Sequence, residues 1–270
     1  MGRLPQGEAA ARVSALLDII VEAALAAGAE IEAIYGAGFA HETKADGSPV
    51  TIADQRAEEI ILARLAAAFP DIPVVAEEQA SAGLIPECGE LFFLVDPLDG
   101  TKGFIKRTGE FTVNIGLIEK GVPVAGVVYA PVSGTLYYGS REEGAFRHRT
   151  REAEAAEPIR TRARPAKGLT AIGSRDHHVE GSEARAAALG VVEYLPSGSS
   201  LKFCMLAEGS ADVYPRYGPT MEWDTAAGQA VLEAAGGRVM VLDGDREAGA
   251  LRYGHSERGY LNPHFIAWAV

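Results

Sequence analysis

One apolar run in this chain stops at a pair of aspartates, and that junction constrains the fold more than any other stretch. The run Leu91–Val95 is typical of a buried strand, and Asp96 and Asp99 follow it directly. Further strand-like segments come after it, separated by turns that contain glycine, and a shorter one precedes it. The sequence therefore predicts an antiparallel meander after a buried strand whose end carries charge. The additional strand segments cover 72–78, 110–131, 134–140 and 144–148.

Helical periodicity surrounds these strands. Apolar residues recur at helical spacing over 8–35, and a second helix is expected over 53–69, where Pro70 ends it. The polar range 41–51 is expected to be a loop, and 148–168 a surface connection between two halves. In the later part of the chain, strands alternate with helices. Strands are expected at 169–173, 191–195, 211–215, 238–242 and 265–270, and helices at 182–189, 199–208 and 224–235.

Helices that alternate with strands in this way predict an α/β protein of layered α+β type, in which helices cover sheets. We expect one compact catalytic unit with two parts. The first, 1–150, is an N-terminal α+β half that holds the charged strand end, and the second, 151–270, is a C-terminal α/β half.

Composition excludes several classes of protein. The formal net charge is −12, so a nucleic-acid polymer is not an expected partner, although local cations can still favour a small phosphorylated ligand. No apolar run reaches the ~18–20 residues of a membrane span, and the first residues lack a secretory signal. The two cysteines, Cys88 and Cys204, are too far apart to suggest a zinc ribbon. We expect a cytoplasmic protein, with peripheral association at the inner membrane face left open, and the oligomeric state is not predicted.

The stretch after the buried strand is suited to a cation. Pro97 stiffens the turn between Asp96 and Asp99, and Gly100 allows close approach of backbone N–H groups to an anion. Carboxylates this close repel one another unless a cation lies between them, and hard oxygen ligands suit Mg²⁺. The alternative is an aspartate-rich turn that only caps a loop.

Other carboxylates favour the metal interpretation. Glu77 ends a second strand-like run, while Asp54 and Asp224 stand near expected helix starts, Asp224 at an ordinary N-cap position. Taken singly, Asp54 and Asp224 are better explained as helix caps than as metal ligands. Together with Asp96 and Asp99 they would form an acidic cluster that needs a cation.

Three motifs in the order AEE, DPLDGT and WDTAAG resemble the lithium-sensitive, magnesium-dependent phosphatases of the inositol monophosphatase superfamily. The resemblance runs from about Lys44 to the C-terminus and implies an inositol monophosphatase-like α-β-α-β-α sandwich. Within the superfamily the chain is similar to the bacterial CysQ-type 3′(2′),5′-bisphosphate nucleotidases, because Lys102 and Gly103 follow DGT where inositol monophosphatases typically have Asn two places later.

That resemblance implies hydrolysis of the 3′-phosphate of adenosine 3′,5′-bisphosphate to AMP, which recycles this nucleotide in sulfur assimilation. Activity on the sulfated nucleotide PAPS is left open. Two or three Mg²⁺ ions per site and inhibition by lithium are also implied. The implied metal ligands are Glu77, Asp96, the Leu98 carbonyl, Asp99 and Asp224; Thr101, paired with Asp54, and Glu77 are the implied catalytic residues.

Substrate contacts are expected from residues around these motifs. Each Lys or Arg expected near the nucleotide is explained equally well as a substrate contact and as a solvated surface charge. For Trp223 and Phe203, packing in the core is favoured over stacking on adenine. The candidates for substrate binding are Glu77, Leu98, Asp99, Gly100, Thr101, Lys102, Ser174, His177, Ser200, Lys202, Arg216 and Asp224.

Two alternatives remain at this stage. The first is an inositol-1-monophosphatase or fructose-1,6-bisphosphatase from the same superfamily. The second is a non-catalytic metal-binding protein, against which the threonine of the DGT motif argues, because storage of a metal needs no hydroxyl beside a phosphate.

Overall fold

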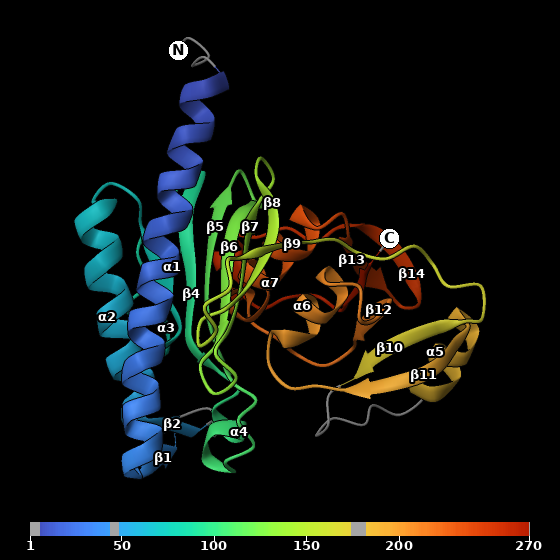
Figure 1. Ribbon diagram of the computed structural model, residues 1–270, viewed down its shortest axis with the longest axis horizontal. Coiled ribbons are helices and arrows are strands. Elements are labelled where there is room, and N and C mark those ends of the chain that lie inside the picture. Colours follow the sequence, from blue (N-terminus) through green and yellow to red (C-terminus); the bar gives the residue numbers. More distant parts are fainter. Residues whose placement is uncertain (1–5, 44–48, 174–181, 270) are drawn as a thin grey trace.

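A seven-stranded sheet forms the first half of the computed structural model, which describes residues 6–43, 49–173 and 182–269 (Figure 1). β3 and β4 are parallel, and each later pair in the sheet is antiparallel. The order is the order of the chain: β3 (Val74–Ala76), β4 (Leu91–Asp99), β5 (Thr112–Glu119), β6 (Val122–Ala130), β7 (Thr135–Ser140), β8 (Gly144–Arg149) and β9 (Glu157–Ile159).

Two long helices cover the outer face of this sheet. α1 (Gln6–Ala37) buries Leu17, Ile20, Ala24, Ala27 and Ile31, a spacing of three and four residues that places them on one side of the helix. α2 (Ile52–Ala68) buries every fourth residue from Ala53 to Leu65 in the same way. Both helices pack on the first sheet through the side that carries these buried residues. The spacing of apolar residues along each helix thus determines which side faces the sheet.

The opposite face of the sheet packs on α7 (Glu222–Ala234), which lies between the two sheets beside α6 (Leu201–Ala207). A helix that is buried on all sides needs small residues where a sheet approaches closely. Gly116 and Gly126 of the sheet meet Ala227, and a Cβ atom on either glycine would lie within 3.0 Å of α7. These glycines allow the helix to lie directly against β5 and β6.

A six-stranded sheet forms the next layer, and α5 (Ser182–Leu189) packs beyond it on β11. Its order in the described residues is β11 (Val191–Pro196), β10 (Leu169–Gly173), β12 (Val213–Arg216), β15 (Phe265–Trp268), β13 (Arg238–Asp243), β14 (Arg246–Ala250). The layers follow as helix, sheet, helix, sheet, helix, which confirms the expected α-β-α-β-α sandwich. No helix in the described ranges is both long enough and apolar enough to cross a membrane.

Several expectations need correction. The range 41–51 is not only loop, because β1 (His41–Thr43) and β2 (Pro49–Thr51) pair as a short ribbon. The polar connection after 148 contributes β9, whose Ile159 is buried opposite Ala145. The strand expected at 265–270 is present as β15, which lies inside the second sheet between β12 and β13. The division into halves at residue 150 stays a prediction.

Gly126 offers a test of the close approach of the sheet to α7. A methyl group there would lie 2.6 Å from the Ala227 carbonyl oxygen, so Gly126→Ala should lower the free energy of unfolding. We expect a loss of about 1–3 kcal/mol, the usual range for overpacking. The control is Gly36→Ala in α1, where nothing lies within 4 Å of the new atom. Equal urea midpoints for the two variants would contradict this account of the packing.

Glu58 offers a second test of how the fold is held. Its buried carboxylate accepts backbone N–H groups of Glu78 (2.7 Å) and Gln79 (2.9 Å), so α2 caps the first turn of α3 (Glu77–Ser81). Glu58→Ala should lower the free energy of unfolding by about 1–3 kcal/mol, because two donors lose their acceptor. The adjacent Glu59 is exposed and pairs only with Arg56 in the contacts described, so Glu59→Ala should change it by less than about 0.5 kcal/mol. Similar thermal unfolding of the two variants would show that the cap contributes little.

Candidate active site

The carboxylate turn is built by a break in the β4–β5 ladder. Asp96 pairs with Asn114 and Asp99 pairs with Thr112, so two residues of β4 face one of β5. Pro97 has no N–H for the ladder, which explains why the pairing is interrupted there and resumes afterwards. The buried Asp96 carboxylate accepts the Leu98 N–H at 3.0 Å. Asp96 therefore lies at a bulge inside the strand. The sequence had suggested instead that it lies at the end of the strand.

The next residues turn the chain into α4 (Thr101–Ile105). Gly100 has φ of +96°, and a Cβ atom there would lie 2.9 Å from the Glu110 carbonyl oxygen, so both backbone conformation and space require glycine. The turn places Thr101 beside Asp54: its hydroxyl lies 3.1 Å from Asp54 Oδ1 and 3.2 Å from the Leu98 carbonyl oxygen. The expected pairing of Asp54 with Thr101 is thus present as a contact.

Asp54 is fixed by its own helix. It lies in the first turn of α2, and its Oδ2 accepts both the backbone N–H (2.8 Å) and the hydroxyl (2.7 Å) of Thr51. Burial raises the pKa of Asp54, and the Thr51 donors oppose that shift. One oxygen of this carboxylate thus holds the start of α2, while the other faces Thr101. Asp54 therefore holds the start of its helix and also contacts Thr101, and its catalytic role stays a prediction.

Glu77 reaches the site because β3 and β4 are parallel, which brings their carboxyl ends to one edge of the sheet. It is the first residue of α3, whose next two backbone N–H groups are bound by Glu58. Sequence reasoning missed Glu58, although its place four residues after Asp54 puts both on one side of α2. A second carboxylate on that side was the available signal.

Asp224 approaches from α7. It is the third residue of that helix and not its N-cap, and its Oδ2 accepts the Met221 N–H at 2.8 Å. The helix begins two residues earlier than expected because Glu222 is buried and binds the backbone N–H groups of Gly254 and His255, at 2.6 and 3.0 Å. From the third position of the helix, Asp224 therefore binds the backbone N–H that precedes the helix. Its charge also acts on the carboxylate of Asp96.

The electrostatics show that these carboxylates share one site. Burial raises the pKa of Asp96 well above its usual range, and the charges of Glu77, Asp99 and Asp224 raise it further. The pKa of Asp224 is also raised well above its usual range, first by burial and then by Asp99 and Glu77. Four acidic groups that disfavour one another's charge are a donor set of hard oxygens, which fits Mg²⁺.

The carboxylates are nevertheless held mainly by donors of the protein. Within the described residues no three His, Cys, Asp or Glu side chains are already arranged as metal ligands. Asp99 Oδ2, for example, lies 2.8 Å from the Ser199 hydroxyl and 3.0 Å from that of Ser200. The carboxylate oxygens are the kind of ligand that Mg²⁺ prefers, and they lie near one another. Their assignment as metal ligands remains a prediction.

Cationic side chains stand on the other side of Asp99 and Asp224. Lys202 is buried and donates to the Ser199 carbonyl oxygen at 2.5 Å. Burial lowers the pKa of Lys202 to about 8. The charge of Asp99 opposes this shift, and the charge of Arg216 adds to it. Arg216 donates to the carbonyl oxygens of Gly218 and Pro219. The structure thus brings both predicted cations close to the acidic cluster.

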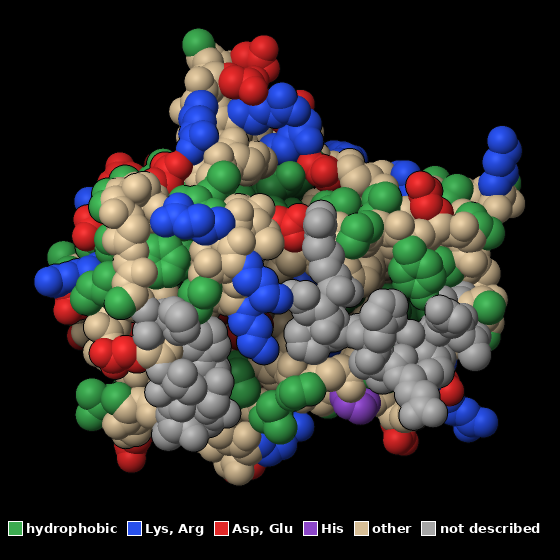
Figure 2. Space-filling model, turned by 90° about the horizontal axis from the view of Figure 1, so that it is seen from below, with side chains coloured by type: hydrophobic (Ala, Val, Ile, Leu, Met, Phe, Trp, Pro, Cys, Tyr) green, Lys and Arg blue, Asp and Glu red, His purple; other side chains and the backbone are tan. Residues whose placement is uncertain are grey.

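The remaining candidates differ in their surroundings. Lys102 is exposed on α4. Figure 2 shows Lys and Arg side chains near the middle of one face of the molecule. The hydroxyl of Ser200 is buried among protein partners, so its contact with substrate stays a prediction. Ser174 and His177 lie outside the described residues. Trp223 packs near Tyr260, and Phe203 against Tyr214 and Phe265, which agrees with packing roles.

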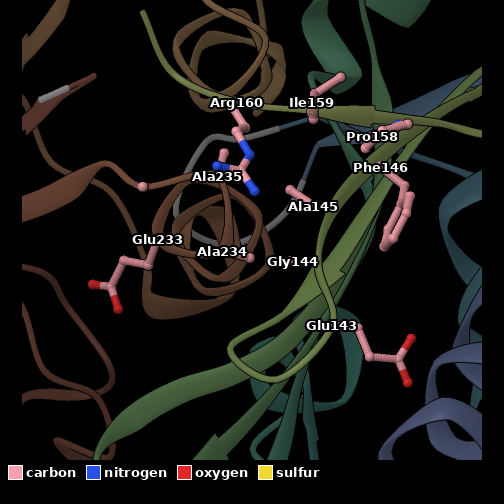
Figure 3. Close-up of a pocket in the computed structure, with 11 residues that line it drawn as sticks. Glu143, Gly144, Ala145, Phe146, Pro158, Ile159, Arg160, Glu233, Ala234 and Ala235 are labelled. Atoms are coloured by element: carbon pink, nitrogen blue, oxygen red, sulfur yellow. The ribbon is translucent and has the colours of Figure 1, made fainter. Parts of the chain in front are cut away.

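A pocket of about 320 Å³ lies at the opposite end of α7 from Asp224. Glu233, Ala234 and Ala235 line it from the end of the helix, and Ala145 and Ile159 line it from the first sheet (Figure 3). None of the predicted site residues borders it. The candidate site therefore rests on the convergence of side chains and not on this cavity.

Comparisons with known proteins agree with this geometry. The sequence model described as the inositol monophosphatase family matches residues 12–268. The chain is 42% identical to the 3′(2′),5′-bisphosphate nucleotidase CysQ of Salmonella typhimurium over 257 residues, which covers 93% of this chain and 98% of that protein. The relative from Escherichia coli K12 with the same name has the same identity and coverage.

Solved structures give the same result. CysQ from Bacteroides thetaiotaomicron, described as a bacterial member of the inositol monophosphatase family, is 40% identical, with a TM-score of 0.76 over 94% of this chain and 97% of that one. Inositol monophosphatase from Anabaena is 26% identical, with a TM-score of 0.72 over 96% of this chain and 92% of that one. The match thus covers the bulge, the Thr101–Asp54 pair and both sheets, and the chain belongs to the inositol monophosphatase family.

Proposed function

We propose that this chain is a magnesium-dependent 3′(2′),5′-bisphosphate nucleotidase. It would hydrolyse the 3′-phosphate of adenosine 3′,5′-bisphosphate, which gives AMP and inorganic phosphate. The observation that carries a hydrolytic function is the Thr101 hydroxyl, held by Asp54 beside the acidic cluster. The nucleotide substrate is supported by the relatives named as 3′(2′),5′-bisphosphate nucleotidases.

Cation binding would draw together carboxylate oxygens that protein donors now hold. Glu77 and Asp96, with the Leu98 carbonyl, would hold one Mg²⁺, and Asp96, Asp99 and Asp224 a second; a third is left open. When bound, Mg²⁺ lowers the pKa of a coordinated water and neutralises charge on the phosphate. Because burial and mutual repulsion already disfavour the ionised carboxylates, cation binding and ionisation of the cluster would reinforce each other.

Thr101 would position the attacking water. Its single hydroxyl proton is directed to Asp54 or to the Leu98 carbonyl oxygen, which leaves lone pairs on Oγ1 to accept a hydrogen bond from water. That bond would point a lone pair of the water oxygen at phosphorus. As the new P–O bond forms, the bond from phosphorus to the ribose 3′-oxygen would break, and Glu77 would take the proton that the water loses. The leaving 3′-oxygen would take a proton from solvent water, which gives the 3′-hydroxyl of AMP.

The scissile phosphate would be held by the turn that follows the aspartates. Gly100, in its left-handed conformation, allows its own N–H and that of Thr101 to face an anion without a side chain in the way. Most of the catalysis would then be positioning and electrostatic stabilisation of the phosphoryl group, as is usual for phosphoryl transfer.

The rest of the nucleotide needs cationic partners. Lys202 and Arg216 lie close to Asp99 and Asp224, so they are well placed to bind the second phosphate, and Lys102 adds an exposed cation at the start of α4. PAPS carries a phosphosulfate at the corresponding position and would present the same charge to these residues. Its relative activity is decided by the assay below.

A substrate panel tests the proposed function. Adenosine 3′,5′-bisphosphate, PAPS, inositol 1-phosphate and fructose 1,6-bisphosphate are compared by phosphate release at matched Mg²⁺. We expect the highest kcat/KM for adenosine bisphosphate. A preference of more than about tenfold for inositol phosphate, equivalent to about 1.4 kcal/mol, would favour the alternative phosphatase. Metal binding without turnover of any of these phosphomonoesters would favour a non-catalytic binder.

The metal assignment has its own test in Asp99→Asn, which keeps the size of the side chain and removes its charge. At saturating Mg²⁺ we expect kcat to fall by about 10²-fold or more, the size of one electrostatic contribution in an active site. The matched control is Asp71→Asn, since Asp71 is an exposed aspartate at a turn. Turnover near that of wild type would show that Asp99 is not part of the metal site.

A further inference from the structure

A chain of buried polar side chains leads from β5 to Asp99. Thr112 and Asn114 are fully buried, and the Thr112 hydroxyl donates to Asn114 Oδ1 at 2.9 Å. Asn114 Nδ2 donates to the Ser200 hydroxyl at 2.9 Å, and Thr112 Oγ1 lies 2.5 Å from Ser199 Oγ. The two serine hydroxyls are the groups that lie within 3.0 Å of Asp99 Oδ2.

The amide of Asn114 gives this chain a direction. An amide N–H can only donate, so Ser200 Oγ must accept from Asn114 and send its own proton elsewhere. The acceptors within reach are Asp99 Oδ2 and the Asp224 carbonyl oxygen, at 3.0 and 2.7 Å. The Thr112 hydroxyl donates to the carbonyl end of the amide, so the N–H end faces Ser200, and Thr112 Oγ1 is left to accept from Ser199. The single hydroxyl proton of Ser199 is therefore shared between Thr112 Oγ1 and Asp99 Oδ2.

The fold explains why these residues meet. Asn114 is the ladder partner of Asp96 and Thr112 that of Asp99, so the bulge and the polar pair belong to one local structure. Residues 112 and 114 point to the same face, towards α6 and α7, because side chains alternate along a strand. Ser199 reaches them with φ of +55°, a backbone conformation uncommon for a residue with a side chain.

We propose that Asn114 and Thr112 are positioning residues, which orient Ser199 and Ser200 so that Asp99 is held in one rotamer for cation binding. The network would also tie the first sheet to the start of α6, so that the cation site is complete only when the two halves are packed together. Partners that orient a metal ligand usually change metal affinity by about 10–100-fold when they are removed. This inference rests on the proposed function, because it takes Asp99 as a ligand.

The test is direct binding of Mn²⁺, a magnesium substitute that is counted by electron paramagnetic resonance, in the absence of substrate. Comparison of wild type with Asp99→Asn defines the binding phase that depends on Asp99. Asn114→Leu and Thr112→Val keep the branching and the number of heavy atoms of each side chain and remove the hydrogen bonds. The control is Thr170→Val, another buried strand threonine, whose hydroxyl contacts Arg162 and Glu193.

We expect Asn114→Leu to weaken the Asp99-dependent phase by about tenfold or more, with the other phases unchanged. Thr112→Val should weaken the same phase, and Thr170→Val should not. In turnover assays, both network variants should need more Mg²⁺ and should approach wild-type kcat when Mg²⁺ is raised. If Asn114→Leu does not fold, Thr112→Val alone decides.

Mn²⁺ affinities within about twofold of wild type in both network variants would overturn the inference, as would an equal loss in every phase together with a lower melting temperature. The first outcome means that the network does not act on Asp99, and the second means that it only supports the fold. A wild-type protein that shows the Asp99-dependent phase and releases no phosphate would contradict the proposed function and leave the positioning role intact.

Discussion

The repulsion among Asp96, Glu77, Asp99 and Asp224 is the constraint on which the site depends. Burial raises the free energy of ionising Asp96 and Asp224, and the charges of Glu77 and Asp99 add to this cost. The protein holds them together through donors supplied by its regular structure. Asp96 accepts the N–H of Leu98 in the bulge, and Asp224 the N–H that precedes α7. The positions of Asp96 and Asp224 are therefore set by backbone groups, whereas Asp99 is held by the hydroxyls of Ser199 and Ser200.

This arrangement needs both halves of the chain. Glu77 and Asp96 come from parallel neighbours in the first sheet, while Asp224 comes from a helix between the sheets. The close packing of α7 on Gly116 and Gly126 is what lets its first turn approach the bulge in β4. A change in the spacing of the layers would move one carboxylate relative to the others, so the core and the site cannot be treated as independent.

The sequence predicted those features that depend on local pattern. Periodicity predicted helices that cover sheets, and the family resemblance implied the five layers. The candidate site residues came from motifs at element ends, and their roles stay predictions. The prediction that Asp96 lies at the end of its strand was wrong. Asp96 lies at a bulge inside the strand, and a bulge depends on the partner strand as well as on the local sequence. Asp224 was misplaced as an N-cap, since the buried Glu222 extends the helix through contacts with residues 254 and 255, far along the chain.

Glu58 and Asn114 were missed for the same reason. Neither stands in a recognised motif, and each acts through a group that only the folded chain brings near: the first turn of α3 for Glu58, and Ser200 for Asn114. Roles of this kind become visible once distances between elements are known, because a single buried polar residue in a strand has no local signature of its partner.

The most direct measurement of the central claim is anomalous X-ray scattering from crystals grown with Mn²⁺ and adenosine 3′,5′-bisphosphate. The account predicts anomalous peaks bounded by Glu77, Asp96, Asp99 and Asp224, with the 3′-phosphate between them and the Thr101 hydroxyl. Peaks at other places, with no scatterer among these carboxylates, would contradict it.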